Sequence, residues 1–579
     1  MTRWITDQEF DPTFPVWTRA NAGEVLPEPP SPLGWDLTFE RGCVPGWRDC
    51  AVNRLGSTEE EMPRERPPLM SVFGGYAYLG ATFARIWGER TPGMSAEAID
   101  AAYYGDHPDV PPYRPEPWHE NAESTAIMEA WLGWALFDRD QSELEELRAE
   151  AEAVRDGRPD LSSLSDAELV ERATAQIPLV RRLFDQHINQ TAAASIGPGV
   201  IAQVSAALGE PESALKLIAG LGGVDSAAPS YAMWTLSRTV RGSTLLTSLF
   251  DQGVEGVDSL LRSAGDAEVV VFVDELDEFL AEFGSRGPNE WDLHADTWET
   301  DPTLALAAID RMRLAGDEAD PRAENDARAR ERSAIAERLG GMLDADQEAK
   351  AQFEAALASA AAFVPGRERC KTAIIRVVGE IRMAVRELGR RAVDRGEIVE
   401  PEDLCMLFVD ELEAYGAGTG GSIAAVVAER LDHHAWLRTI EPPFIIASEP
   451  PPVSEWPRAG GSAPQQMGAG DQVTGVPGCP GVAQGRARVV LDPSDPTALG
   501  PGDILVAPVT DPAWTPLFVP AAGVIVDVGA PLSHAIIVSR ELGIPCVVSA
   551  TGATERIPDG ALVELDGATG AVTVLELPD

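Results

Sequence analysis

The fold is decided by the stretch Leu532–Val547, LSHAIIVSRELGIPCV. Ser533 is a favourable helix N-cap residue, and the apolar positions that follow it suit one buried helical face. Gly543 followed by Pro545 is a helix stop signal. These signals predict a helix that begins at Ser533 and ends before Gly543. His534 therefore falls in the first turn, where backbone N–H groups lack helical partners and attract anions such as phosphate.

Short strand candidates separated by turn signals surround this helix. The turns include Pro501-Gly502-Asp503 and Pro558-Asp559-Gly560. Strands are expected at Ala487–Leu491, Ile504–Val506, Gly523–Val526, Cys546–Ser549, Leu562–Leu565 and Val572–Leu575. These segments predict a small β/α domain over residues 476–579. A stretch rich in Pro and Gly, residues 441–475, precedes it and predicts a hinge linker.

Residues 1–440 have a different pattern. The N-terminal part is rich in Pro, Trp and Gly and predicts loops and short elements, whereas long amphipathic helices are expected after it. The longest candidates are Ile127–Arg155, Asp166–Asn189, Arg322–Phe363 and Arg367–Arg395. The expected fold class is therefore multi-domain, with a mainly α-helical domain and a small C-terminal β/α domain.

Composition excludes several classes of partner. The chain has 579 residues and a formal net charge of −47, and such a field repels nucleic acids and anionic membrane surfaces. No uninterrupted apolar run approaches the ~18 residues of a membrane-spanning helix, and the N-terminus has no apolar signal region. The six Cys and seven His residues follow no metal-ligand spacing. We therefore expect a cytoplasmic protein with no metal site and no nucleic acid or membrane partner.

Several ordered motifs within residues 500–547 resemble the mobile phosphohistidine domain of the PEP-utilising enzymes. That family includes PEP synthase, pyruvate phosphate dikinase and the ATP-dependent rifampin phosphotransferases. The resemblance implies that His534 accepts and donates a phosphoryl group, with Ser533 and Thr510 supporting it. A neutral imidazole, with an ordinary pKa of ~6.5, is a good nucleophile at neutral pH. The resemblance also implies that the β/α domain swivels on its linker.

The helical region more weakly resembles the substrate-binding domain of rifampin-phosphotransferase-like proteins. The matching segments are Phe14–Val25, Ile218–Ser226, Glu282–Leu293 and Thr297–Pro302. An acceptor site needs a pocket, a base for the acceptor hydroxyl and cations for the phosphoryl group. The resemblance implies the following candidates: Glu290 as the base, Arg286, Lys371, Arg382 and Arg386 as cations, and Asn21 in the pocket wall.

Each of these candidates has an alternative role in stabilising the fold. Arg382 and Arg386 could instead form ion pairs with Glu380 or Glu387, which lie close in sequence. Two residues depart from the family pattern: Ser285 stands where His is common, and Ala530 stands where a Gly-Gly pair is usual. Neither departure removes the reacting imidazole.

A phosphohistidine needs a source of phosphate. In rifampin phosphotransferases and PEP synthase an ATP-grasp module supplies it, and such a module needs a cation on the nucleotide phosphates and carboxylates for Mg²⁺. Residues 1–470 contain no Gly-rich loop with a neighbouring Lys. We therefore expect a separate ATP-grasp subunit as partner, with ATP and Mg²⁺ bound through it and no cofactor held tightly by this chain.

The resulting hypothesis is an acceptor-binding and phosphocarrier subunit of a two-component, ATP-dependent phosphotransferase that is active with its partner. Phenylphosphate synthase is divided in this way, so the resemblance makes a phenolic small-molecule acceptor plausible. The reaction would convert ATP, acceptor and water into phosphorylated acceptor, AMP and phosphate. Two alternatives remain open: a component related to PEP synthase or pyruvate dikinase that acts on pyruvate or PEP, and a regulatory phosphocarrier with no small acceptor.

Overall fold

The computed structural model describes residues 10–104, 107, 109–458, 466–491, 499–510, 514–529 and 533–578. The chain folds into two compact units. Unit 1 comprises residues 1–193, 289–295 and 369–462, and unit 2 comprises residues 194–288, 296–368 and 463–579. The C-terminal residues, called the β/α module below (463–579), thus belong to the same unit as the central helices. The expected fold class is confirmed: the chain is multi-domain and mainly helical, with a small C-terminal β/α domain.

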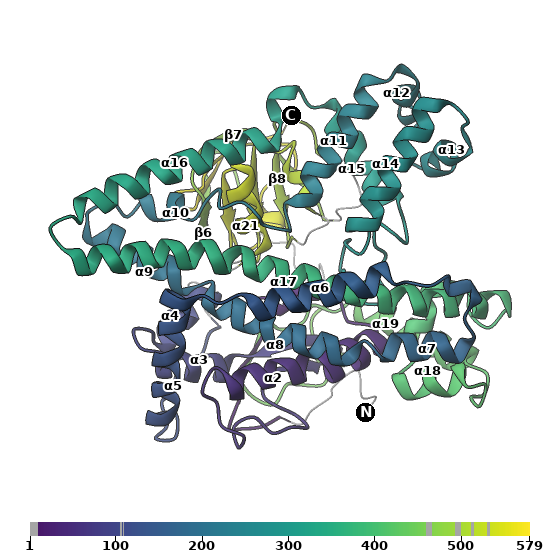
Figure 1. Cartoon of the computed structure of the whole chain (residues 1–579), viewed down its shortest axis with the longest axis horizontal. Helices are drawn as coiled ribbons and strands as arrows, with labels where there is room; N and C mark the ends of the chain where they lie inside the picture. Colours follow the sequence, from purple (N-terminus) through teal and green to yellow (C-terminus); the bar gives the residue numbers. More distant parts are fainter. Residues whose placement is uncertain are drawn as a thin grey trace. The chain divides into compact units, whose positions relative to one another are not determined.

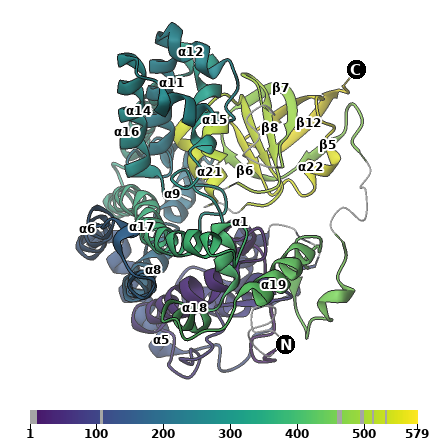
Figure 2. The ribbon, with the colours of Figure 1, turned by 90° about the vertical axis from the view of Figure 1, so that its right-hand side faces the viewer.

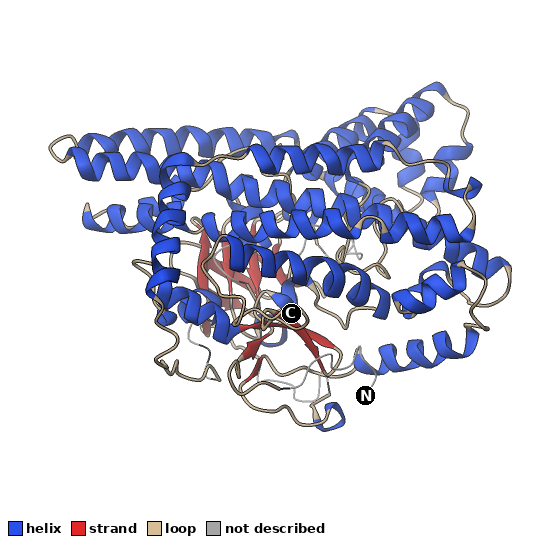
Figure 3. Cartoon of the chain, turned by 60° about the horizontal axis from the view of Figure 1, so that its bottom comes forward, coloured by secondary structure: helices blue, strands red, loops and turns tan. Residues whose placement is uncertain are grey.

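The chain as a whole is mainly helical (Figure 3), and so is unit 1. Its longer α-helices are α2 (Val44–Asn53), α3 (Ala81–Arg90), α4 (Ala96–Tyr104), α5 (Ala122–Gly133), α6 (Ser142–Asp156), α7 (Asp166–Thr174), α8 (Ile177–Ala193), α18 (Val409–Gly416) and α19 (Ala424–Leu437). A small antiparallel sheet has the order β2 (Met70–Phe73), β3 (Tyr76–Gly80), β1 (Trp17–Thr18) and β4 (Ile445–Ile446). Residues far apart in sequence therefore meet in this sheet.

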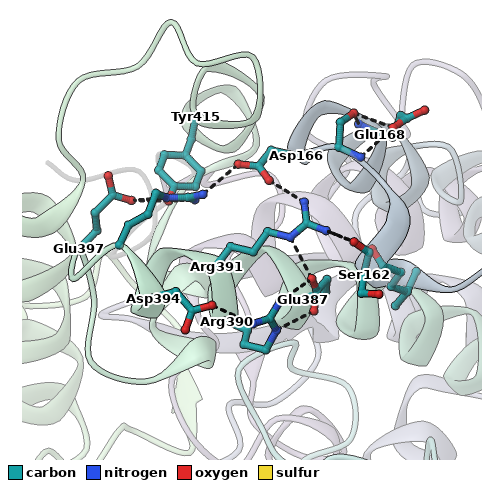
Figure 4. Close-up of polar contacts among 12 residues, drawn as sticks. Ser162, Asp166, Glu168, Glu387, Arg390, Arg391, Asp394, Glu397 and Tyr415 are labelled. Carbon is teal, nitrogen blue, oxygen red and sulfur yellow. Dashed lines mark hydrogen bonds and ion pairs between the residues drawn. The ribbon is translucent and has the colours of Figure 1, made fainter.

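A network of ion pairs ties the C-terminal end of helix α17 (Gln347–Asp394) to α7 in unit 1 (Figure 4). Arg391 donates to Asp166 Oδ1 at 2.8 Å and to Glu387 Oε1 at 2.9 Å. Arg395 reaches the other oxygen of Asp166 at 3.2 Å. Because these arginines are bonded several times over, the network fixes the end of the long helix.

Unit 2 combines a set of helices with the β/α module (Figure 1). The helices are α9 (Ile196–Ala207), α10 (Ser213–Leu217), α11 (Ala228–Gly242), α12 (Thr244–Phe250), α13 (Val257–Ser263), α14 (Ala267–Phe283), α15 (Thr303–Leu314), α16 (Pro321–Met342) and the first half of α17. Two apolar cores form among them, one between α11, α14 and α15 and one between α9, α16 and α17.

The β/α module is built on a mixed sheet of eight strands among its described residues (Figure 2). The order is β5 (Gln472–Thr474), β12 (Ala571–Glu576), β11 (Leu562–Asp566), β7 (Val482–Val489), β8 (Ile504–Ala507), β9 (Gly523–Val526), β10 (Cys546–Val548) and β6 (Val476–Cys479). Strands β7 to β10 run parallel, and the others pair antiparallel. Helix α21 (His534–Leu542) connects β9 to β10 and packs on the sheet as the sequence predicts.

The long helices differ from the prediction in where they break. Helix α17 runs without interruption through Pro365, where the sequence predicts a boundary. The break lies earlier, between Met342 and Gln347, where the Asp346 side chain accepts from the backbone N–H of Ala349 and starts the new helix. A proline removes one helical hydrogen bond, and burial of its neighbours Phe363 and Val364 offsets that loss.

A second predicted helix, Ile127–Arg155, is two helices, α5 and α6. Arg139 has a φ of 60° between them, and the Asp140 side chain accepts from the backbone N–H of Ser142. Among the described residues, no helix is long and apolar enough to cross a membrane. The same part of the chain contains no group of three or more His, Cys, Asp or Glu side chains placed to hold a metal ion.

Candidate active site

The first turn of α21 presents His534. Ser533 occupies the N-cap position with an extended backbone, φ −66° and ψ 158°, but its side chain makes no capping hydrogen bond. Its buried hydroxyl has no hydrogen-bond partner among the described residues, so the expected capping role of Ser533 is not observed. The helix ends at Gly543, whose φ of 71° is a left-handed conformation that glycine adopts without strain.

Both ring nitrogens of His534 contact threonine hydroxyls. Nε2 lies 2.9 Å from Thr515 Oγ1, and Nδ1 lies 3.4 Å from Thr510 Oγ1. The ring of Phe518 lies beside the imidazole, with 6.0 Å between centroids. A hydroxyl both donates and accepts, so two of them can hold a neutral imidazole in either tautomer. Only 7% of His534 is exposed, so the imidazole is largely covered in this conformation.

The sheet topology brings these residues together. Thr510 follows β8, Thr515 begins the short helix α20 (Thr515–Phe518) between β8 and β9, and His534 begins α21 after β9. Parallel strands have their carboxyl ends at one edge of the sheet, which is the usual place for a site in an α/β domain. The segments Asp511–Ala513 and Ala530–Leu532, including the departure at Ala530, lie outside the described residues.

Asp527, at the end of β9, is a second titratable group near this edge. It accepts hydrogen bonds from the backbone N–H and the hydroxyl of Thr554. Burial raises the pKa of its carboxyl to about 6, although these hydrogen bonds lower it. The group is therefore a carboxyl whose charge changes close to neutral pH.

At its other end, α21 contacts the helices of unit 2 through Glu541. The carboxylate accepts from Leu221 N at 3.0 Å, from Gly222 N at 3.2 Å and from Asn325 Nδ2 at 2.7 Å. Glu541 is 3% exposed. Burial raises the pKa of its carboxyl, and the hydrogen bonds and the nearby Arg332 guanidinium oppose the rise. Three donors therefore surround a carboxylate that has lost its water.

Three of the predicted acceptor-site residues lie together in unit 1. Arg382 on α17 donates from Nη2 to the carbonyl oxygens of Glu290 at 2.7 Å and Asp292 at 2.9 Å. Lys371 lies earlier on the same helix, and its Nζ is 3.5 Å from Glu290 Oε1. Arg382 is 1% exposed, and its Nε and Nη1 have no hydrogen-bond partner among the described residues. Burial, together with the neighbouring charge of Arg386, lowers the pKa of Arg382 to about 10.

Arg386 lies one turn beyond Arg382 and holds the same segment. It donates to the carbonyl oxygen of His294 at 2.9 Å and to Glu402 Oε2 at 2.5 Å. The carboxylates close by in sequence, Glu380 and Glu387, are bonded by other arginines. Glu380 forms ion pairs with Arg155, Arg158 and Arg172, and Glu387 forms ion pairs with Arg390 and Arg391. The two arginines on α17 therefore anchor residues 289–295 by their backbone.

The remaining candidates lie elsewhere. Asn21 in unit 1 precedes the one-turn helix α1 (Ala22–Val25) with a φ of 60°, and its carbonyl oxygen accepts from Glu24 and Val25. Arg286 is 1% exposed and belongs to unit 2, where its backbone pairs with Phe283 and Trp298. Ser285 beside it is also buried. The roles of Asn21 and Arg286 in an acceptor site stay predictions.

Sequence reasoning assigned no role of their own to Thr515, Glu541 or Asn325. Thr515 belongs to a segment, Trp514-Thr515, that matches the family pattern, so the signal for its role was present. Glu541 carries no comparable signal, because a glutamate at the end of an apolar helix is ordinary. Its partners lie more than 200 residues away in sequence, and only the fold brings them to it.

Comparisons with known proteins agree with this geometry. Residues 499–570 match the model of the PEP-utilising enzyme mobile domain, and residues 186–368 match that of the rifampicin phosphotransferase fourth domain. The β/α module therefore contains a stretch similar to the mobile domain of the PEP-utilising enzymes, a family of phosphohistidine-dependent phosphotransferases.

Three relatives illustrate the similarity. An uncharacterised protein of Mycobacterium tuberculosis is 41% identical over 213 residues, which are 36% of this chain and 23% of the relative. The rifampicin phosphotransferase of Streptomyces sviceus is 28% identical over 376 residues, 64% of this chain and 42% of the relative. The prodigiosin synthesizing transferase of Serratia marcescens is 28% identical over 347 residues, which are 59% of this chain and 38% of the relative. The chain thus spans less than half the length of each.

Proposed function

We propose that this chain binds a small-molecule acceptor and carries a phosphoryl group to the acceptor hydroxyl on His534. The observation that carries the proposal is the imidazole in the first turn of α21, contacted at both nitrogens by threonine hydroxyls within a PEP-utilising mobile domain. A nucleophile held in one orientation loses less entropy on reaction than a mobile one. The backbone N–H groups of the helix start favour the negative charge of a phosphoryl group.

The reaction takes place in two transfers. In the first, an imidazole nitrogen attacks the β-phosphorus of ATP, the bond between the α-phosphoryl oxygen and the β-phosphorus breaks, and AMP leaves. Water then removes the γ-phosphoryl group as phosphate, the ring N–H proton passes to solvent, and phospho-His534 remains. In the second, the acceptor oxygen attacks the phosphorus and the P–N bond breaks. Glu290 accepts the hydroxyl proton, and the departing imidazole nitrogen takes up a proton from solvent, so that the neutral ring is restored.

The cluster in unit 1 supports the acceptor part of the proposal. Lys371 and Arg382 supply positive charge next to Glu290, and the unpartnered Nε and Nη1 of Arg382 are donors that phosphoryl oxygens would satisfy. Trp291, next to Glu290 in sequence, packs against Phe39 and Phe184, with ring centroids 6.0 and 6.2 Å apart. An aromatic, phenolic acceptor fits these surroundings and is the first class to test.

The charging step requires a nucleotide site. We propose that a separate ATP-grasp subunit provides this site and binds ATP and Mg²⁺. The proposed location of the reaction is the cytoplasm. The sheets of this chain support a separate nucleotide-binding partner. Among the described residues there are two, the small antiparallel sheet of unit 1 and the sheet of the β/α module. Neither presents a lysine beside a Gly-rich loop of the kind that holds nucleotide phosphates.

The proposal is tested by incubating the full chain with an ATP-grasp protein encoded beside it and ATP labelled at the β-phosphorus. Label is expected on the wild type and on His433→Ala, a control that changes a histidine of α19 in unit 1. His534→Ala should remain unlabelled. Equal labelling of His534→Ala and the wild type would contradict the proposal. Transfer of the label to a phenol, and not to pyruvate, identifies the acceptor class.

A further inference from the structure

One polar contact in unit 2 has no part in the two transfers. The Glu541 carboxylate, at the last turn of α21, accepts from the backbone N–H groups of Leu221 and Gly222 and from the Asn325 side chain. Just beyond it, the carbonyl oxygen of Gly543 accepts from Arg328 Nη2 at 3.1 Å. Asn325 and Arg328 both lie on α16, outside the β/α module. These bonds therefore join the module to the central helices.

The turn that receives Glu541 is shaped for a carboxylate. Gly220 and Gly222 have φ values of 57° and 73°, a conformation that turns the successive N–H groups of Leu221 and Gly222 toward one point. A Cβ added to Gly220 would lie 2.7 Å from the backbone nitrogen of Ala329, so the turn is also fitted closely to α16. The two amides and Asn325 form one preorganised anion site.

The face of the module that contacts the central helices also bears His534, the phosphoryl carrier. Glu541 and His534 are seven residues apart on α21, which places them on the same side of the helix about 10 Å apart along its axis. Helix α20, which supplies Thr515 and Phe518, packs against α11 and α15. The imidazole is 7% exposed in this arrangement. The carrier imidazole and the Glu541 contact therefore lie on the same face of the module.

We propose that Glu541, bound by the Leu221 and Gly222 amides and Asn325, is a latch that holds the β/α module in a docked resting state with His534 covered. This proposal rests on the function proposed above, because only a carrier has to leave the docked position. Release of the latch precedes each transfer, and the site that Glu541 leaves on the central helices receives it again when the module returns.

Several features make this contact reversible. The contact at Glu541 is polar. The module and the central helices each have their own apolar cores, which touch at their edges through Tyr231 and Val519. A cavity of about 440 Å³ adjoins Glu541 and is lined by Tyr231, Arg322 and Asn325. Water in this space competes for the carboxylate. The raised pKa of Glu541 has the same cause, because docking removes the hydration of the carboxylate and the three donors replace it only in part.

The latch is tested without any phosphoryl donor, by the rate at which diethylpyrocarbonate modifies His534 in the full chain, resolved by peptide mass spectrometry. Glu541→Ala removes the carboxylate, and Asn325→Ala removes one donor from outside the module. Loss of hydrogen bonds to a charged group should raise the rate about tenfold in Glu541→Ala and less in Asn325→Ala. Glu576→Gln, an exposed carboxylate at the end of β12, is the matched control and should not change the rate.

A second probe separates release from unfolding. Cys546 in β10 is fully buried inside the module, so a thiol reagent should leave it unmodified in every variant that retains the fold. Faster modification of His534 with Cys546 protected supports the latch. An unchanged His534 rate in both variants, or an increase accompanied by reaction of Cys546, would overturn it. Neither probe involves ATP or an acceptor, so failure of the proposed function would show separately, as an unlabelled His534.

Discussion

Thr515 and His534 are joined by a hydrogen bond of 2.9 Å between the threonine hydroxyl and imidazole Nε2, and the two side chains are 0% and 7% exposed. A single turn of helix, α20, brings the hydroxyl to the ring. This bond fixes one nitrogen of the carrier, and its removal should affect the chemistry of the ring more than the stability of the domain.

Thr515→Val keeps the shape of the side chain and removes the hydroxyl. A buried neutral hydrogen bond contributes about 1 kcal/mol, so the initial rate of His534 labelling by the ATP-grasp partner should fall about fivefold to tenfold. Thr474→Val, at an exposed position of β5, should label at the wild-type rate. A Thr515→Val variant that labels as fast as the wild type would show that the bond does not orient the ring.

Lys371→Met should separate the two transfers. The substitution removes the cation 3.5 Å from Glu290 in unit 1 and leaves His534 in the β/α module unchanged. We expect normal labelling of His534 and a reduction of about tenfold or more in label passed to the acceptor, measured by single-turnover chase. Lys350→Met, which changes a half-buried lysine near the start of α17, is the control. Equal loss in both variants would remove Lys371 from the acceptor site.

Asp527 predicts a pH dependence of stability in the β/α module. Its pKa is raised from 3.8 to about 6 in the folded state, mainly by burial. The stability that it contributes is therefore fully present below the unfolded pKa of 3.8 and is lost as the pH rises through about 6. Between pH 5 and pH 8 this loss amounts to about 1 kcal/mol.

Asp527→Asn cannot ionise, so its free energy of unfolding, measured by urea denaturation, should lack this loss. The difference between Asp527→Asn and the wild type should shift by about 1 kcal/mol in favour of Asn from pH 5 to pH 8. Glu576→Gln, an exposed position of the same module, should show no such shift. The same pH profile for Asp527→Asn and the wild type would exclude a raised pKa at this site.

Glu380 should be the carboxylate whose loss most destabilises unit 1. Its side chain is 0% exposed and is bonded by Arg155, Arg158 and Arg172. Glu380→Gln removes the buried carboxylate that these three arginines share, and the free energy of unfolding should fall by about 3–5 kcal/mol. Glu146→Gln, exposed on α6, should change it by less than about 0.5 kcal/mol. Similar unfolding curves for both would contradict this role.

The parts of the molecule that the sequence predicts well depend on local signals. Helix α21 is predicted because Ser533, the apolar run and Gly543 lie next to one another and each favours the same helix. Strands β7 to β12 of the β/α module are predicted for a similar reason, since turn residues separate short aliphatic runs, whereas β5 and β6 are not predicted. His534 is placed at the helix start by these signals, and the family resemblance supplies its expected role.

The parts that the sequence does not predict depend on distant contacts. Arg382 and Arg386 have nearby carboxylates, yet they bind backbone carbonyls of residues 289–295, which only the fold brings to α17. The passage of α17 through Pro365 has a similar cause, because local propensity opposes it and packing on both sides of the helix favours it. Glu541 is unremarkable in the sequence and becomes specific only next to its partners.

The continuous helix α17 has a consequence for how the protein unfolds. Its first half contributes Phe353, Ala356 and Ala360 to one apolar core, and its second half contributes Ile374 and others to the core of unit 1. Helical hydrogen bonds propagate along the chain, so melting of one half removes support from the other. Heating should therefore disrupt both cores in a single cooperative step, although each has its own set of packed side chains.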